Sequence, residues 1–164
     1  YHENSEEIFE IQTEVFKKHV ELAKKYDKPL VVHGRNSEAQ MMEFFKKHIT
    51  PGDVTGVIHC FPEGPEYAEF FTKNYGFFIG IGGTATYPKA ENIREAIAAT
   101  PIEFIVTETD APFLVPQSLR KTVKRNDASL LPEVIELIAD IKKLPVSEVA
   151  DILFENAKRL YQLK

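Results

Sequence analysis

Cysteine is nearly absent from this sequence, which has only Cys60 among its 164 residues. A single cysteine excludes an internal disulfide and a cysteine-rich zinc site. The sequence also lacks an apolar run near the ~18 residues that a membrane-spanning helix needs, and no signal peptide opens it. These absences predict a cytoplasmic protein in a reducing compartment, with no membrane partner.

An excess of positive charge is lacking too, because 25 Asp and Glu outweigh 20 Lys and Arg to give a net charge of -5. This balance argues against broad coating of DNA but allows a local basic groove. With 43% hydrophobic residues, 8 Gly and 10 Pro, the composition excludes collagen-like and long disordered chains. The chain starts at Tyr1 and not at Met, so we expect an N-terminus that is processed, cut or incomplete.

Short apolar runs alternate with amphipathic helical patterns along the chain. The predicted strands are 30–32, 57–58, 77–81 and 104–106. The predicted helices are an opening one capped by Asn4 or Ser5 and ending near Tyr26, then 37–47, 65–73, 89–99, 131–143 and 147–160. Because the first strand shows no polar alternation, we expect it to be buried on both faces, as in parallel sheets. The order predicts a parallel α/β fold, with a long loop over 111–129 that is functional or mobile.

Polar side chains follow three of the four predicted strands. The residues are His33 and Arg35 after the first, His59 after the second, and Glu108 and Asp110 after the fourth. Ligands of parallel α/β proteins bind at this edge of the sheet. A lone histidine at a strand end is more often structural, but two imidazoles and a carboxylate at equivalent ends favour a divalent metal site.

A metal at this edge accounts for hydrolytic chemistry, because it lowers the pKa of bound water and stabilises charge on a phosphoryl or carbonyl oxygen. Asp110 is suited both to hold the metal and to take the proton of the attacking water. Arg35 either clamps a phosphate or forms a salt bridge with a loop carboxylate. The basic stretch 120–125 is either a rim for a DNA backbone or a solvated loop.

Other residues near the strand ends have two interpretations each. Three aromatic residues fall in loops after strands, namely Phe61, Tyr87 and Phe113. Each either stacks on a base or packs in the core. Gly80, Gly82 and Gly83, at the end of the third strand, do not form a dinucleotide fingerprint and predict close backbone packing at a strand end. Cys60 has no thiol partner in the sequence and is interpreted as a packed residue.

Four motifs occur in an order that is typical of one family. They are Val31-Val32-His33-Gly34-Arg35, Ile58-His59-Cys60-Phe61, the 78–83 segment, and Thr107-Glu108-Thr109-Asp110-Ala111-Pro112-Phe113-Leu114. Arg125-Asn126 and Glu155-Asn156-Ala157 fit the same pattern. Over essentially its whole length, the chain resembles the TatD family of metal-dependent deoxyribonucleases, within the amidohydrolase-like TIM barrels.

The resemblance implies a (β/α)₈ barrel and hydrolysis of phosphodiester bonds in DNA, as an exonuclease. It implies His33, His59 and Asp110 as ligands of divalent Mg, Mn or Zn, with Glu108 as a supporting residue. Arg35 and Arg125 are the implied phosphate contacts, and single-stranded DNA or a 3′ end is the expected partner.

Two family motifs are lacking, a His-x-His on the first barrel strand and a metal-bridging Glu on the fourth. We therefore expect strands five to eight only, with residues 1–164 forming a single incomplete domain that lacks the N-terminal half of the barrel. A full barrel needs roughly 250 residues, which agrees.

A half barrel leaves two apolar edge strands without partners. Three explanations stay open: the first half lies outside this sequence, the chain pairs with another copy or a separate half, or it stands alone with an incomplete site. The functional alternatives are a non-catalytic half barrel that acts in assembly or binding, and a related metal hydrolase of another ester or amide.

Overall fold

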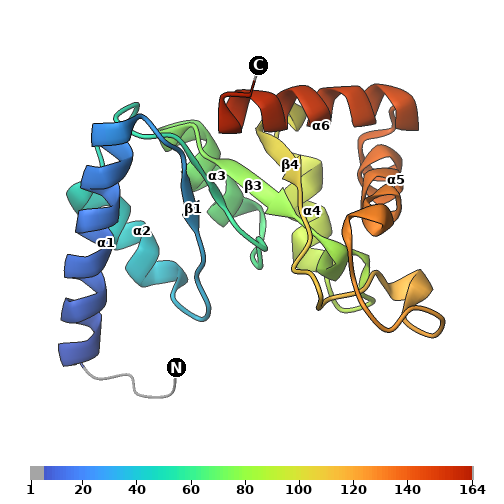
Figure 1. The fold of residues 1–164 in the computed structure, drawn as a ribbon, viewed down its shortest axis with the longest axis horizontal. Helices are drawn as coiled ribbons and strands as arrows, with labels where there is room; N and C mark the ends of the chain where they lie inside the picture. Colours follow the sequence, from blue (N-terminus) through green and yellow to red (C-terminus); the bar gives the residue numbers. More distant parts are fainter. Residues whose placement is uncertain (1–5, 164) are drawn as a thin grey trace.

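The computed structural model describes residues 6–163, in which four short strands alternate with helices (Figure 1). The strands are β1 (Leu30–Val32), β2 (Gly56–Ile58), β3 (Phe78–Ile81) and β4 (Ile105–Thr107). The α-helices are α1 (Glu6–Tyr26), α2 (Glu38–His48), α3 (Pro65–Tyr75), α4 (Glu91–Ala99), α5 (Leu131–Lys142) and α6 (Val146–Tyr161). The predicted elements are confirmed, with ends that shift by a few residues. The predicted cap at Asn4 or Ser5 lies outside the described residues. Between residues 6 and 163, no helix is long and apolar enough to cross a lipid bilayer.

The strands form one sheet in the order β1-β2-β3-β4, and every neighbouring pair is parallel. Parallel neighbours need a crossover connection, which α2, α3 and α4 provide in turn. The α/β class with a parallel sheet is therefore confirmed. In the described part of the chain β1 and β4 are the two edges of the sheet, and all four carboxyl ends lie on one side of it.

The larger core lies between one face of the sheet and the helices that cover it. Phe45 of α2 is fully buried there, and its ring meets Phe71, Tyr75 and Phe77 edge to face at centroid distances of 4.8, 5.1 and 5.0 Å. Such aromatic pairs add packing energy beyond the area they bury. This cluster supports the middle of the sheet, and hence the loops at its carboxyl end.

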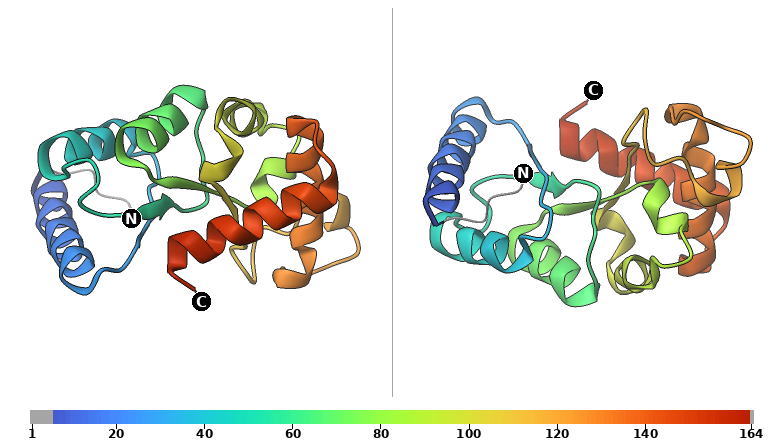
Figure 2. Two further views of the ribbon diagram at one scale, coloured as in Figure 1. Left: turned by 90° about the horizontal axis from the view of Figure 1, so that it is seen from above. Right: turned by 90° about the horizontal axis from the view of Figure 1, so that it is seen from below.

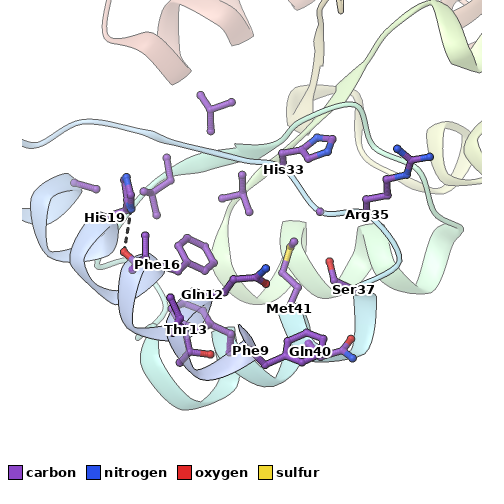
Figure 3. A pocket seen from close by; sticks show the side chains of 18 of the residues that line it. Phe9, Gln12, Thr13, Phe16, His19, His33, Arg35, Ser37, Gln40 and Met41 are labelled. Atoms are coloured by element: carbon purple, nitrogen blue, oxygen red, sulfur yellow. Dashed lines mark hydrogen bonds between the residues drawn. The ribbon is translucent and has the colours of Figure 1, made fainter. Parts of the chain in front are cut away.

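The prediction that the first strand is buried on both faces is wrong. Leu30 and Val32 are 8% and 5% exposed, but Val31 is 57% exposed. On β2 to β4 the face that carries Val31 is covered by a second apolar cluster, Val57, Phe78, Val106 and Leu160. Leu160 belongs to α6, which packs on β4, at the edge of the sheet opposite to β1. The second cluster therefore does not reach β1. Val31 instead lines an open groove of about 1320 Å³ beside α1 (Figure 3).

Helix α6 is fastened to the edge of the sheet by the buried side chain of Asn156. Its amide Nδ2 donates to the carbonyl oxygens of Ile102 and Ile105, each at 2.8 Å. Figure 2 shows α6 passing from α5 toward the middle of the sheet. Asn156 therefore gives Ile105 of β4 a hydrogen bond that a neighbouring strand provides elsewhere, and it also holds the turn before β4 through Ile102. This is a structural role for the Glu155-Asn156-Ala157 motif.

Replacing Asn156 with Leu is expected to lower the free energy of unfolding by about 1–3 kcal/mol, because the buried carbonyl of Ile105 and the part-buried carbonyl of Ile102 lose their donor. Urea denaturation followed by circular dichroism measures the change. Glu155→Gln is the matched control, since Glu155 is exposed and pairs only with Lys158 at 3.2 Å. Equal stability of the Asn156 and Glu155 variants would contradict the fastening role.

Candidate functional site

The candidate site lies at the carboxyl edge of the sheet, on the face that carries Val31. Side chains alternate along a strand, so His33, His59 and Glu108 each lie two residues beyond Val31, Val57 and Val106, on one face. Backbone hydrogen bonds continue the ladder to this point, because His59 N–H donates to Val32 O at 2.8 Å. The short parallel strands thus bring residues from three segments together.

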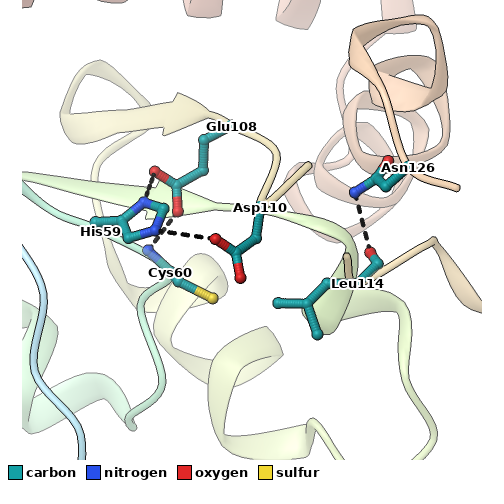
Figure 4. Close-up of polar contacts among 6 residues, drawn as sticks. All are labelled: His59, Cys60, Glu108, Asp110, Leu114 and Asn126. Carbon is teal, nitrogen blue, oxygen red and sulfur yellow. Dashed lines mark hydrogen bonds and ion pairs between the residues drawn. The ribbon is translucent and has the colours of Figure 1, made fainter. Parts of the chain in front are cut away.

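His59 is the centre of the arrangement and lies between two carboxylates (Figure 4). Its Nδ1 is 2.8 Å from Oε2 of Glu108, and its Nε2 is 3.6 Å from Oδ1 of Asp110. The backbone N–H of Cys60 donates to Oε1 of Glu108. Both oxygens of Glu108 are therefore engaged, and its contact with Nδ1 orients the imidazole so that Nε2 faces Asp110.

The two carboxylates have different environments. The side chain of Glu108 is 17% exposed and that of Asp110 is 46% exposed. Burial raises the pKa of Glu108 above its ordinary value, and the hydrogen bond from His59 acts against this rise. Glu108 is thus placed to hold His59, whereas Asp110 faces the solvent from which a substrate would approach.

A glycine on β3 makes room for Glu108. A Cβ atom at Gly80 would lie 2.5 Å from Oε2 of Glu108, which is far inside van der Waals contact. The sequence predicted close packing for this glycine, and the structure identifies the carboxylate of Glu108 as the group that packs there. No local pattern indicates this contact, because Gly80 is on β3 and Glu108 follows β4.

The remaining predicted ligand and the predicted phosphate contacts lie farther out. The ring centroids of His33 and His59 are 5.7 Å apart, so the two imidazoles are neighbours at the ends of β1 and β2. Arg35 is exposed and lines the same groove as His33 (Figure 3). Arg125 is exposed in the loop before α5. The structure places Arg35 and Arg125 near the carboxyl edge without bringing them into contact with His59 or Asp110.

The fit of this site to a divalent metal follows from the donor atoms present. Over the described residues, no group of three or more His, Cys, Asp or Glu side chains is arranged to hold a metal ion. The pair formed by His59 Nε2 and Asp110 Oδ1 is nevertheless compatible with one, since two ligands at about 2.1 Å from a tetrahedral metal lie about 3.4 Å apart. His33 lies beside His59, with the two ring centroids 5.7 Å apart. The residues therefore fit part of a metal site.

The loop after Asp110 is held in place by residues that the sequence analysis did not assign. Asn126 is 2% exposed, its N–H donates to Pro112 O at 3.0 Å, and its Nδ2 donates to Leu114 O at 3.3 Å. Thr86 Oγ1 accepts from Gln117 N–H at 2.8 Å. The long loop is pinned on both sides, and the Arg125-Asn126 motif was its one sequence signal.

The three aromatic candidates have different environments. Phe61 is 1% exposed and belongs to the core. Tyr87 donates its hydroxyl to Val115 O at 3.1 Å, and the guanidinium of Arg120 lies 4.9 Å from its ring centroid. Phe113 is 67% exposed. Of the three, Phe113 is the residue with an open ring face.

Comparison with known proteins identifies the family. A family model described as TatD related DNase matches residues 1–162. The chain belongs to this TatD family. It is 34% identical over 154 residues to the uncharacterized metal-dependent hydrolase YabD of Bacillus subtilis. This match covers 94% of the present chain and 59% of YabD. It is 33% identical over 154 residues to the human 3′-5′ RNA nuclease TATDN2, covering 93% of this chain and 20% of TATDN2.

The fold of the TatD chain matches a solved family structure. The crystal structure of the TatD homologue YjjV from Escherichia coli superposes with a TM-score of 0.83 at 29% identity, over 94% of this chain and 58% of YjjV. The chain thus spans somewhat more than half the length of YabD and YjjV, and a fifth of the length of TATDN2. These matches show that the chain belongs to the TatD family of metal-dependent hydrolases and has a TIM-barrel-like α/β fold. Several relatives are named metal-dependent hydrolases, which is consistent with the use of divalent metal ions.

Proposed function

We propose that this chain is part of a metal-dependent nuclease that hydrolyses phosphodiester bonds of DNA and acts as an exonuclease. The observation that supports this most is His59 held by Glu108 on one ring nitrogen and facing Asp110 with the other. A histidine oriented by a carboxylate, with its free nitrogen beside a second carboxylate, is typical of metal sites. A cytoplasmic location is part of the proposal and rests on the single cysteine.

In this proposal His33, His59 and Asp110 hold the divalent ion, which is Mg, Mn or Zn. When bound, the ion would polarise a phosphoryl oxygen of the substrate and lower the pKa of a water molecule. Asp110 accepts the proton of the attacking water, since its carboxylate is the more exposed of the two. Glu108 keeps the His59 ring in place, and Arg35 and Arg125 bind the phosphates of the strand.

We further propose that the four strands are strands five to eight of an eight-stranded barrel. Residues 1–164 then form one domain that contains only this second half of the barrel. Within residues 6–163, β1 and β4 each have a neighbouring strand on one side only, and this supports the proposal together with the exposed Val31 and the open groove beside α1. The coverage of 59% of YabD is in keeping with it. A complementary set of four β/α units then pairs with β1 through the groove, whereas His33, His59 and Asp110 are the ligands that this chain itself contributes.

The test is cleavage of end-labelled single-stranded DNA, and of RNA of the same sequence, by the 164-residue chain. We expect stepwise shortening from one end with Mn²⁺, Mg²⁺ or Zn²⁺ and none with a chelator. Faster cleavage of RNA than of DNA would contradict the proposed substrate. A folded sample that binds DNA without cutting it would favour the second candidate, a non-catalytic binding unit. The lack of a three-ligand group in the described residues is the observation behind that candidate.

A further inference from the structure

Phe113 is an exposed aromatic residue beside the candidate site. Its exposed fraction of 67% is the largest among the large hydrophobic side chains that the structure describes. Its backbone N–H donates to Asp110 O at 2.7 Å. This hydrogen bond closes a turn of four residues, which brings the two Cα atoms within about 7 Å of each other. The ring is therefore attached directly to the segment that carries the proposed proton acceptor.

The segment around Phe113 is clamped, so the ring is not exposed through looseness of the loop. Asn126 holds Pro112 O and Leu114 O from one side. On the other side Gly83 packs so closely that a Cβ there would lie 2.1 Å from Leu114 O. Leu114 has a φ of +57°, a left-handed conformation that a leucine keeps only when its surroundings impose it. The fold thus presents the Phe113 ring from a rigid support.

The charge of the loop that carries Phe113 favours a nucleic acid strand as the occupant. The same loop carries four exposed cationic residues, Arg120, Lys121, Lys124 and Arg125. Exposed aromatic rings next to cationic side chains are the combination by which proteins bind single strands, with bases on the rings and phosphates on the cations. An apolar protein partner would have little use for the four charges.

We propose that Phe113 is a stacking platform for an unpaired nucleobase of the substrate, next to Asp110. This inference rests on the proposed function and adds the group that positions the strand. Stacking on Phe113 tolerates every base, since each has a π-face, and it requires the base to be unpaired. The platform therefore selects single-stranded ends over duplex.

The test uses two short single-stranded DNAs that differ only at the terminal nucleotide, which is 2-aminopurine in one and abasic in the other. Binding to the 164-residue protein is measured with Ca²⁺ in place of Mn²⁺. Phe113→Leu keeps an apolar side chain without the π-face, and Phe113→Trp keeps a ring. We expect Phe113→Leu to weaken binding of the 2-aminopurine strand about tenfold and to abolish the quenching of its fluorescence. Phe113→Trp should retain both.

The abasic strand separates stacking from other effects. We expect wild type and Phe113→Leu to bind it equally. An equal loss on both strands, or no loss on either, would overturn the platform. Unchanged binding together with a changed particle mass in solution would assign Phe113 to a protein contact and also overturn it. Failure of the wild type to bind both DNAs would instead refute the proposed function itself.

Discussion

Replacing Asp110 with Asn is expected to lower the turnover of single-stranded DNA about 10²- to 10⁴-fold, the range typical of a lost general base. Asn has the same shape but carries no charge and accepts no proton. It also weakens the negative ligand that faces His59 Nε2 at 3.6 Å. Initial rates on end-labelled DNA over a range of Mn²⁺ concentrations measure the effect, because a loss that persists at saturating Mn²⁺ belongs to the proton transfer.

The fold is expected to tolerate Asp110→Asn, since the side chain is 46% exposed and its ion pair with His59 is long. The thermal midpoint should stay close to that of the wild type. Asp140→Asn is the matched control, because Asp140 is an exposed residue of α5 that pairs only with Lys143 at 3.1 Å. Full activity of the Asp110 variant, or an equal loss in the Asp140 variant, would refute the assigned role.

The fold class was predictable because its signals are local. Short apolar runs bounded by Pro and Gly indicate strands, and amphipathic periods indicate the helices between them. Gly76, for example, ends α3 with a left-handed φ of +68°. The exposure of Val31 was not predictable in this way. It depends on how far Leu160 of α6 reaches across the sheet, a contact between residues at opposite ends of the chain.

The candidate site was predictable in its residues and not in its contacts. Strand ends indicated His33, His59 and Asp110, and the family resemblance assigned Glu108 a supporting role; these assignments stay predictions. The hydrogen bond between His59 and Glu108 joins residues 49 positions apart, so no local pattern contains it. The clamp of Asn126 on the loop is likewise a tertiary contact. Propensity and periodicity describe single elements, whereas these contacts depend on how the strands lie in the sheet.

A methyl group at Gly80 is expected to disturb the site through Glu108. In Gly80→Ala the new Cβ would lie 2.5 Å from Oε2 of Glu108, and the backbone of β3 is fixed by pairing on both sides. The carboxylate is the movable partner, so it should swing away and release Nδ1 of His59. Loss of such a supporting carboxylate typically weakens metal affinity about 10- to 100-fold. Calorimetric titration with Mn²⁺ measures it.

The control for Gly80→Ala is Gly64→Ala, because a Cβ at Gly64 meets no atom within 4 Å and its φ is -86°. That variant should bind Mn²⁺ as the wild type does. A second comparison tests whether the methyl group acts through Glu108. In a Glu108→Ala background the carboxylate is gone, so adding Gly80→Ala should not lower the affinity for Mn²⁺ any further. Additive losses would mean that the methyl group acts on the site by another path, through the β3 backbone. Because Gly80 is buried on β3, away from the solvent, a non-additive result would identify the link between sheet packing and the orientation of His59.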